Sequence, residues 1–197
     1  MSSRLIVRQL VGEADSGEWM AGVCDWVTAQ ELAESESFAP RRRREYLTWR
    51  ATVRQELGRD VAIGYDASGA PKVDRRGVFI SVSHSKNLVA VCIGNARCAV
   101  DTEPLDRNFG RVQSRYMSED ESLLSDDGRL AAAVWCAKEA LYKLGGRVGT
   151  DFLYDIAVTQ VDFAAGRICG TIHGSRVVEL TMTCADNNII VSGEAGE

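Results

Sequence analysis

The chain has 197 residues, of which 45% are hydrophobic and 26% are charged, and its formal net charge is −5. This length accommodates one large domain or two small ones, and either can bury a core. The modest acidity argues against a general nucleic-acid binder, although basic patches can exist locally. Because the first residues contain no long apolar segment, we expect neither a signal peptide nor a membrane span.

Six cysteines are scattered along the chain without a Cys-x-x-Cys pattern or a Cys/His cluster. His84 and His173 are the only histidines in the sequence, so we do not expect a zinc site. Several cysteines stand in apolar runs, where a buried free thiol is the ordinary state. These features predict a reduced, cytoplasmic setting.

The first half of the chain begins with a predicted strand over residues 5–11 and a surface helix over 26–36. A longer helix is predicted over 41–57, because Pro40 precedes an amphipathic stretch and Gly58 follows it. One face of this helix is rich in arginine, and a solvated charged face would have the same composition. The arginines of this stretch are Arg41, Arg42, Arg43, Arg44, Arg50 and Arg54.

A turn-rich passage over residues 65–72 follows, marked by Gly69 and Pro71. Val, Ile and Cys are then enriched in three stretches that we predict to be strands, over residues 78–83, 88–94 and 98–103. The connections at 85–87 and 95–97 are short enough for hairpins.

The second half of the chain opens with Ser118 and Glu121, whose spacing predicts a capping box and a short helix to about residue 124. A longer helix is predicted over 129–144, ending at a glycine pair. Four further strands are predicted over residues 156–161, 167–172, 177–184 and 188–192. Each half therefore shows a helix followed by antiparallel strands, and the expected fold class is α+β.

Two carboxylates end the third of the central strands. Alternation along a strand places Asp101 and Glu103 on the same side, where they can share one hard cation. A solvated strand end would give the same pattern. Against that interpretation, like charges on one face repel each other, and a bound divalent cation removes this cost.

A further carboxylate and an ammonium stand on the longer helix of the second half. Glu139 and Lys143 are four residues apart and so lie on one helix face, where they can also form an ordinary stabilising ion pair. Together with Asp101 and Glu103, they predict a site for a Mg²⁺-bound phosphate ester.

Ser83-His84-Ser85 ends the first of the central strands. A serine next to a histidine suggests a hydrolase, but no Gly-x-Ser-x-Gly elbow surrounds this pair. The histidine and the hydroxyl groups can instead donate hydrogen bonds to a phosphate. A purely structural histidine remains equally compatible with the sequence.

Taken together, three segments resemble the motifs of the 4′-phosphopantetheinyl transferases. Residues 79–85 resemble the family's apolar strand with its Ser-His-Ser signature. Residues 98–103, Cys-Ala-Val-Asp-Thr-Glu, resemble its (Val/Ile)-Gly-(Ile/Val)-Asp-(Ile/Val)-Glu motif, with alanine in place of glycine and threonine in place of an aliphatic residue. Residues 135–143, Trp-Cys-Ala-Lys-Glu-Ala-Leu-Tyr-Lys, resemble its (Phe/Trp)-x-x-Lys-Glu-(Ala/Ser)-x-x-Lys motif.

The resemblance implies a site that binds coenzyme A and a metal ion. Asp101, Glu103 and Glu139 would hold Mg²⁺, or Mn²⁺, against the diphosphate of coenzyme A. Glu139 would also help to deprotonate the attacking serine, and Lys143 would neutralise the phosphate that is transferred. Further coenzyme contacts are implied for basic and hydroxyl side chains, namely Arg43, Arg50, Arg54, Lys72, Ser83, His84 and Lys138.

The implied reaction moves 4′-phosphopantetheine from coenzyme A to a serine of an apo acyl or peptidyl carrier protein and releases adenosine 3′,5′-bisphosphate. The implied molecule is a monomer of two similar halves, 1–103 and 104–197, related by pseudo-two-fold symmetry. We expect the carrier to dock on residues 105–120 through Arg107, Arg111 and Arg115. Neither a nucleic acid nor a membrane is expected as a partner. The alternatives are a non-catalytic coenzyme A-binding module and a Mg²⁺-dependent phosphohydrolase.

Overall fold

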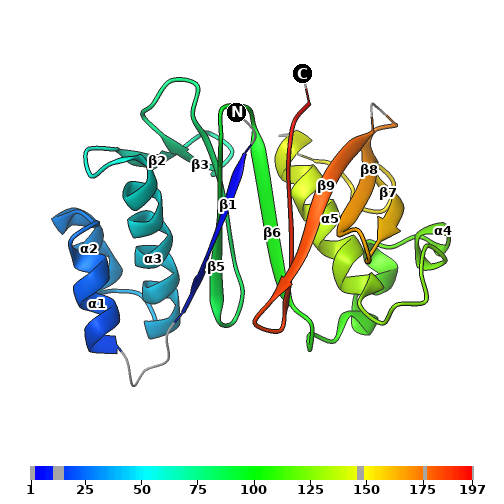
Figure 1. The fold of residues 1–197 in the computed structure, drawn as a ribbon, viewed down its shortest axis with the longest axis horizontal. Helices are drawn as coiled ribbons and strands as arrows, with labels where there is room; N and C mark the ends of the chain where they lie inside the picture. The colour runs from blue at the N-terminus through cyan, green and yellow to red at the C-terminus, as the bar shows by residue number, and fades with distance from the viewer. Residues whose placement is uncertain (1–2, 11–15, 146–148, 175–176, 197) are drawn as a thin grey trace.

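The computed structural model describes residues 3–10, 16–145, 149–174 and 177–196. These residues form a mixed α+β structure with two antiparallel sheets and a small two-stranded ribbon, which agrees with the predicted fold class. The two sheets meet in the middle of the molecule, and helices lie on the outer side of each (Figure 1). Within the described part of the chain, no helix has the length and apolar character needed to cross a membrane.

The first sheet has the strand order β1-β5-β4, with β1 over Arg4–Gln9, β5 over Leu88–Gly94 and β4 over Phe79–His84. The central strand β5 is buried along its whole length, as its unbroken run of apolar and small residues predicts. The predicted end of the first strand at Val11 lies outside the described residues. The hairpin predicted at 85–87 is confirmed, because β4 and β5 are antiparallel neighbours.

Helix α3 (Pro40–Leu57) packs on the first sheet through Trp49 and Val53, which contact apolar residues of β1, β4 and β5. Two shorter helices, α1 (Ser16–Cys24) and α2 (Ala29–Ser35), lie beside α3 on the side away from the sheet (Figure 1). Helix α2 begins three residues later than predicted because Thr28 and Glu31 form a capping box there. The ribbon pairs β2 (Ile63–Tyr65) with β3 (Pro71–Val73).

The second sheet has the strand order β6-β10-β9-β8-β7. Its strands are β6 over Cys98–Pro104, β7 over Ile156–Asp162, β8 over Arg167–Ile172, β9 over Val178–Ala185 and β10 over Asn188–Glu194. The two-residue turn between β9 and β10 is Asp186-Asn187, with φ angles of 49° and 59°. Asp and Asn tolerate this left-handed conformation, which suits a tight hairpin.

Helix α5 (Leu130–Gly145) packs on the second sheet and forms the largest core cluster with it. The short helix α4 (Glu119–Ser122) precedes α5, and the predicted capping box of Ser118 and Glu121 is confirmed. Two single-turn 3₁₀ helices, at Phe109–Arg111 and Gln113–Arg115, lead from β6 toward α4.

The hairpin predicted at residues 95–97 is wrong. Strand β6 pairs with β10 of the second sheet, although only three residues separate it from β5. On the side of β6 that faces β4, serine hydroxyl groups accept hydrogen bonds from the backbone: Ser81 from Val100 N, and Ser83 from Thr102 N. Side chains therefore satisfy donors that a neighbouring strand would otherwise satisfy. The predicted division after residue 103 falls within β6 and stays a prediction.

Candidate functional site

Asp101 lies on β6 where that strand faces β4, and it is only 6% exposed. Its Oδ1 atom accepts hydrogen bonds from Ser83 Oγ at 2.9 Å and from Lys143 Nζ at 2.9 Å. The other oxygen, Oδ2, is also buried and accepts no hydrogen bond from an N–H or O–H group of the described residues. The buried Cys136 thiol of α5 is a close neighbour: burial raises its pKa, and the Asp101 carboxylate adds to the rise. Since an unpartnered buried carboxylate oxygen is costly, this atom is suited to receive a ligand.

Glu139 and Glu103 stand close enough to Asp101 to feel its charge. Burial raises the pKa of Glu139, the Asp101 carboxylate adds to the rise, and Lys143 opposes it. Burial likewise raises the pKa of Glu103, although Arg107, with which Glu103 forms an ion pair, opposes the rise. The structure thus brings the three predicted carboxylates into one electrostatic neighbourhood.

The three carboxylates do not form a preformed metal-binding site. Among the residues that the structure describes, no three His, Cys, Asp or Glu side chains are grouped so that they could hold a metal ion. Glu103 is turned to Arg107, while Asp101 is held by Ser83 and Lys143. The best-suited ligand atom is therefore the free Oδ2 of Asp101.

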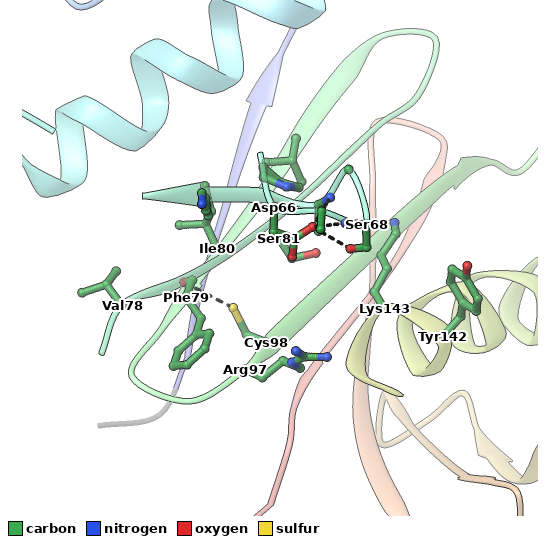
Figure 2. Close-up of a pocket in the computed structure, with 16 residues that line it drawn as sticks. Asp66, Ser68, Val78, Phe79, Ile80, Ser81, Arg97, Cys98, Tyr142 and Lys143 are labelled. Carbon is green, nitrogen blue, oxygen red and sulfur yellow. Dashed lines mark hydrogen bonds between the residues drawn. The ribbon is translucent and has the colours of Figure 1, made fainter. Parts of the chain in front are cut away.

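Lys143, which pairs with Asp101, also lines a cleft of about 710 Å³. The turn between β2 and β3, the first part of β4, the start of β6 and the end of α5 line this cleft (Figure 2). Among the described residues that line it, three have cationic side chains, Lys72, Arg97 and Lys143, and one, Asp66, has a carboxylate. An anionic ligand with an apolar portion would suit this lining.

The turn at one end of the cleft is held in shape by Asp66. Its Oδ1 atom accepts hydrogen bonds from the backbone nitrogens of Ser68, at 2.8 Å, and Ala70, at 3.0 Å, and also from the Ser68 hydroxyl. These bonds, with the Ser68 hydroxyl first, lower the pKa of Asp66. Lys72 extends from the same hairpin, is exposed and lines the cleft; its contact with the coenzyme stays a prediction.

Two of the predicted coenzyme contacts on α3 must be corrected. Arg54 is 3% exposed, and its guanidinium donates two hydrogen bonds to Glu31 of α2, at 2.7 and 2.9 Å. Arg50 is equally buried and stacks on the rings of Tyr46 and Trp49. Both side chains are enclosed in the protein because buried Glu31 attracts them, so neither is available to a ligand.

The beginning of α3 presents a different group of side chains. His84 Nδ1 lies 3.4 Å from Glu45 Oε2, and its Nε2 lies 3.2 Å from Arg42 Nη1. Burial lowers the pKa of His84, Glu45 opposes this, and the positive charges of Arg42, Arg41 and Lys143 add to the lowering. A neutral imidazole that donates from Nδ1 and accepts at Nε2 fits both contacts.

Arg42 was not among the predicted contacts, yet it reaches His84 and keeps an exposed side chain. The only sequence signal for Arg42 was its place in the arginine run. Arg43, the third predicted arginine, is half-buried. Arg97 and Tyr142 also line the cleft, and no sequence pattern predicts that a turn residue and a helix residue share it.

Lys138 is the third predicted coenzyme contact that the structure corrects. Its side chain is fully buried, its Nζ lies 2.8 Å from Glu121 Oε1, and it donates to the Phe152 carbonyl at 2.7 Å. Burial lowers the pKa of Lys138, and Glu121 opposes this. Glu121 also accepts from Val158 N, so the pair connects α4, α5 and β7 and is enclosed by them. A ligand cannot reach this ammonium.

A scan against protein-family models finds none that matches the chain, and a search of curated proteins finds no significant match. The three motifs and the geometry around Asp101 therefore carry the functional argument.

Proposed function

We propose that this protein transfers the 4′-phosphopantetheine group of coenzyme A to a serine of an apo acyl or peptidyl carrier protein, as 4′-phosphopantetheinyl transferases do. The observation that supports this proposal best is the arrangement of Asp101 and Lys143 beside the cationic cleft. One oxygen of Asp101 binds Lys143, and the other is buried without a partner among the described residues. Lys143 also lines the cleft, so a phosphate ester bound there would lie next to the ammonium that pairs with Asp101.

The arrangement of the two sheets is compatible with the finer fold that this family implies. One long helix packs on each antiparallel sheet, α3 on the first and α5 on the second. We propose that the two halves are related by a pseudo-two-fold axis, with the candidate site where they meet.

The chemistry of the donor set fits a hard divalent cation. Asp101, Glu103 and Glu139 would hold Mg²⁺ or Mn²⁺, and the unpartnered Oδ2 of Asp101 supplies the kind of oxygen that these ions bind. When bound, the ion would neutralise charge on the diphosphate of the coenzyme. For Glu103 to take part, its ion pair with Arg107 has to open.

The chain's own residues would position the phosphate and accept a proton. Lys143 lies in the cleft and places positive charge beside the phosphate to be transferred, which is what phosphoryl-type transfer mainly requires. Burial raises the pKa of Glu139, and this makes its carboxylate a better proton acceptor for the carrier serine. Exposed Arg42 and half-buried Arg43, in place of Arg50 and Arg54, are the arginines of α3 that we assign to the 3′-phosphate.

The test is the intact mass of a panel of apo carrier proteins after incubation with this protein, coenzyme A and Mg²⁺. We expect a gain of one phosphopantetheine group that a chelator abolishes. Asp101→Ala and Glu139→Ala should lose this transfer while remaining folded, and Glu36→Ala, at the exposed residue that follows α2, is the control.

Other results would redirect the assignment. Coenzyme A binding without modification of any carrier would identify a non-catalytic binding module. Release of phosphate from small esters without a carrier would identify a phosphohydrolase. Unchanged turnover by a folded Glu139→Ala variant would remove Glu139 from the mechanism.

A further inference from the structure

Two serines on one face of β4 connect the two sheets of the molecule. Ser81 Oγ accepts a hydrogen bond from Val100 N at 3.1 Å, and Ser83 Oγ accepts one from Thr102 N at 3.3 Å. Both serines are at least nine-tenths buried. Their spacing of two residues puts both hydroxyl groups on the side of β4 that faces β6.

The two hydroxyl groups differ in where their hydrogen goes. The Ser83 hydroxyl has one hydrogen, and Thr102 N already occupies an acceptor position on its oxygen. The remaining polar neighbour is Asp101 Oδ1 at 2.9 Å, and a carboxylate can only accept. The hydrogen of Ser83 is therefore committed to Asp101, whereas Ser81 forms no hydrogen bond with a carboxylate of the described residues.

The contact from Ser83 determines which oxygen of Asp101 is free. Oδ1 already accepts from Ser83 and Lys143, whereas Oδ2 has no N–H or O–H donor among the described residues. The neighbouring Cys136 thiol is at most a weak donor to this carboxylate. A carboxylate held by one partner can rotate and exchange its oxygens. Two donors from different elements, β4 and α5, fix the orientation instead.

We propose that Ser83 is a positioning residue that orients the Asp101 carboxylate and presents Oδ2 to the divalent cation. This assignment rests on the proposed function, and it differs from the contact with coenzyme A that the resemblance implies for Ser83. It also excludes a Ser83–His84 nucleophile pair, because the hydroxyl hydrogen is committed to Asp101 and His84 is engaged by Glu45 and Arg42.

The experiment compares Ser83→Ala with Ser81→Ala by isothermal titration of Mn²⁺ into the protein, alone and with coenzyme A, and by thermal unfolding. Removing a hydrogen-bond partner of a metal ligand typically costs about 10- to 100-fold in metal affinity, and we expect a loss in that range for Ser83→Ala. Ser81→Ala removes a similar bond between the sheets without touching Asp101, so its Mn²⁺ affinity in the absence of coenzyme A should match that of the wild type. Because Ser81 also lines the cleft, the two alanine variants are compared in the titration without the coenzyme. Ser83→Thr keeps the hydroxyl group and should recover most of the affinity.

Thermal unfolding separates positioning from a general loss of structure. Both alanine variants should lose similar stability, and only Ser83→Ala should lose Mn²⁺ affinity. Equal Mn²⁺ affinities of the two alanine variants would overturn the proposal, as would a folded Ser83→Thr no better than Ser83→Ala. If Ser83→Ala does not fold, Ser83→Cys, which keeps the size but is a weak donor, takes its place. Failure of the wild type to bind coenzyme A would refute the proposed function, while the titration with Mn²⁺ alone would still test Ser83.

Discussion

Lys138 and Lys143 are five residues apart on the same helix, but their surroundings are opposite. The ammonium of Lys138 is enclosed, and both Glu121 and the Phe152 carbonyl bind it. The side chain of Lys143 is 28% exposed, lines the cleft and shares Asp101 with Ser83. Both carboxylate oxygens of Glu121 accept hydrogen bonds, whereas Asp101 Oδ2 has no N–H or O–H donor among the described residues. An incomplete ion-pair network beside a cleft is the better indicator of a ligand site.

The arginines of α3 show the same contrast. Arg54 and Arg50 are buried and form ion pairs with Glu31, while Arg42 at the beginning of the helix is exposed and contacts His84. A single basic helix thus contributes to the core at one end and to the candidate site at the other. Removing single charges tests this contrast: a buried, paired charge should affect stability, and an exposed charge near the candidate site should affect ligand binding.

The largest effect is expected for Lys138→Met. This change leaves the buried Glu121 carboxylate without its ammonium, and breaking a buried pair costs about 3–5 kcal/mol in the free energy of unfolding. Lys143→Met should cost less, about 1–2 kcal/mol, because Ser83 still donates to Asp101. Its transfer rate should fall about 10²- to 10³-fold, as removal of a transition-state donor does. Urea unfolding and the carrier assay measure the two effects.

The double variant Lys138→Met/Glu121→Gln is the control, because it removes both charges and should recover part of the lost stability. A Lys138→Met protein that unfolds like the wild type but binds coenzyme A weakly would show that Lys138 contacts the coenzyme and does not stabilise the core.

Arg54→Ala and Arg42→Ala form the second comparison. Arg54→Ala should cost about 3 kcal/mol in the free energy of unfolding, since buried Glu31 loses the guanidinium that donates to both of its carboxylate oxygens. Arg42→Ala should leave the unfolding midpoint nearly unchanged and weaken coenzyme A binding about tenfold, the loss of one charge-assisted hydrogen bond. Calorimetric titration of coenzyme A gives the affinity, with exposed Arg59→Ala as the control. Wild-type affinity in the Arg42 variant would contradict our assignment of the 3′-phosphate.

The predicted carrier-docking surface, residues 105–120, also contains both exposed and paired arginines, and charge reversal of the exposed ones tests it. Arg111 and Arg115 are exposed, whereas Arg107 is engaged by Glu103 and stacks near Phe109 and Trp135. Arg111→Glu and Arg115→Glu should each lower kcat/KM for the carrier about tenfold at low salt, with a smaller effect at high salt. The KM for coenzyme A serves as the internal control. Unchanged carrier kinetics in both variants would place the docking surface elsewhere.

The smallest effect concerns the pH dependence of stability without divalent cations. Burial, with Asp101 adding to it, raises the pKa of Glu139, so the folded protein keeps this proton to a higher pH than the unfolded chain. Stability therefore falls as the pH rises from the unfolded value, near 4.5, through the folded pKa. Glu139→Gln removes this penalty and should have a higher Tm than the wild type at neutral pH, with the two curves converging in acid. A Glu139→Gln protein that is less stable at neutral pH would show that the carboxylate is held by a favourable contact.

Most helices and strands were predictable because local signals mark their ends. Glu121 stands three residues after Ser118, as a capping box requires, and the Asp186-Asn187 turn tolerates the left-handed backbone of a tight hairpin. The wrong hairpin at 95–97 shows the limit of such signals. A short connection allows two strands to pair, but whether β6 joins β5 or β10 depends on a strand almost ninety residues away.

In the candidate site, too, some features follow from local sequence patterns and others from long-range contacts. Strand alternation and helix periodicity, which are properties of nearby residues, placed Asp101 and Glu103 on one side of β6 and Glu139 near Lys143 on α5. The sequence by itself therefore determined the α+β class, the elements and the residue types available for a phosphate site. The tertiary structure alone decided which charges are free, because Glu31 reaches Arg54 from another helix, Glu121 encloses Lys138, and Ser83 of β4 orients Asp101. Burial and complete pairing are long-range properties, and no local pattern of residues encodes them.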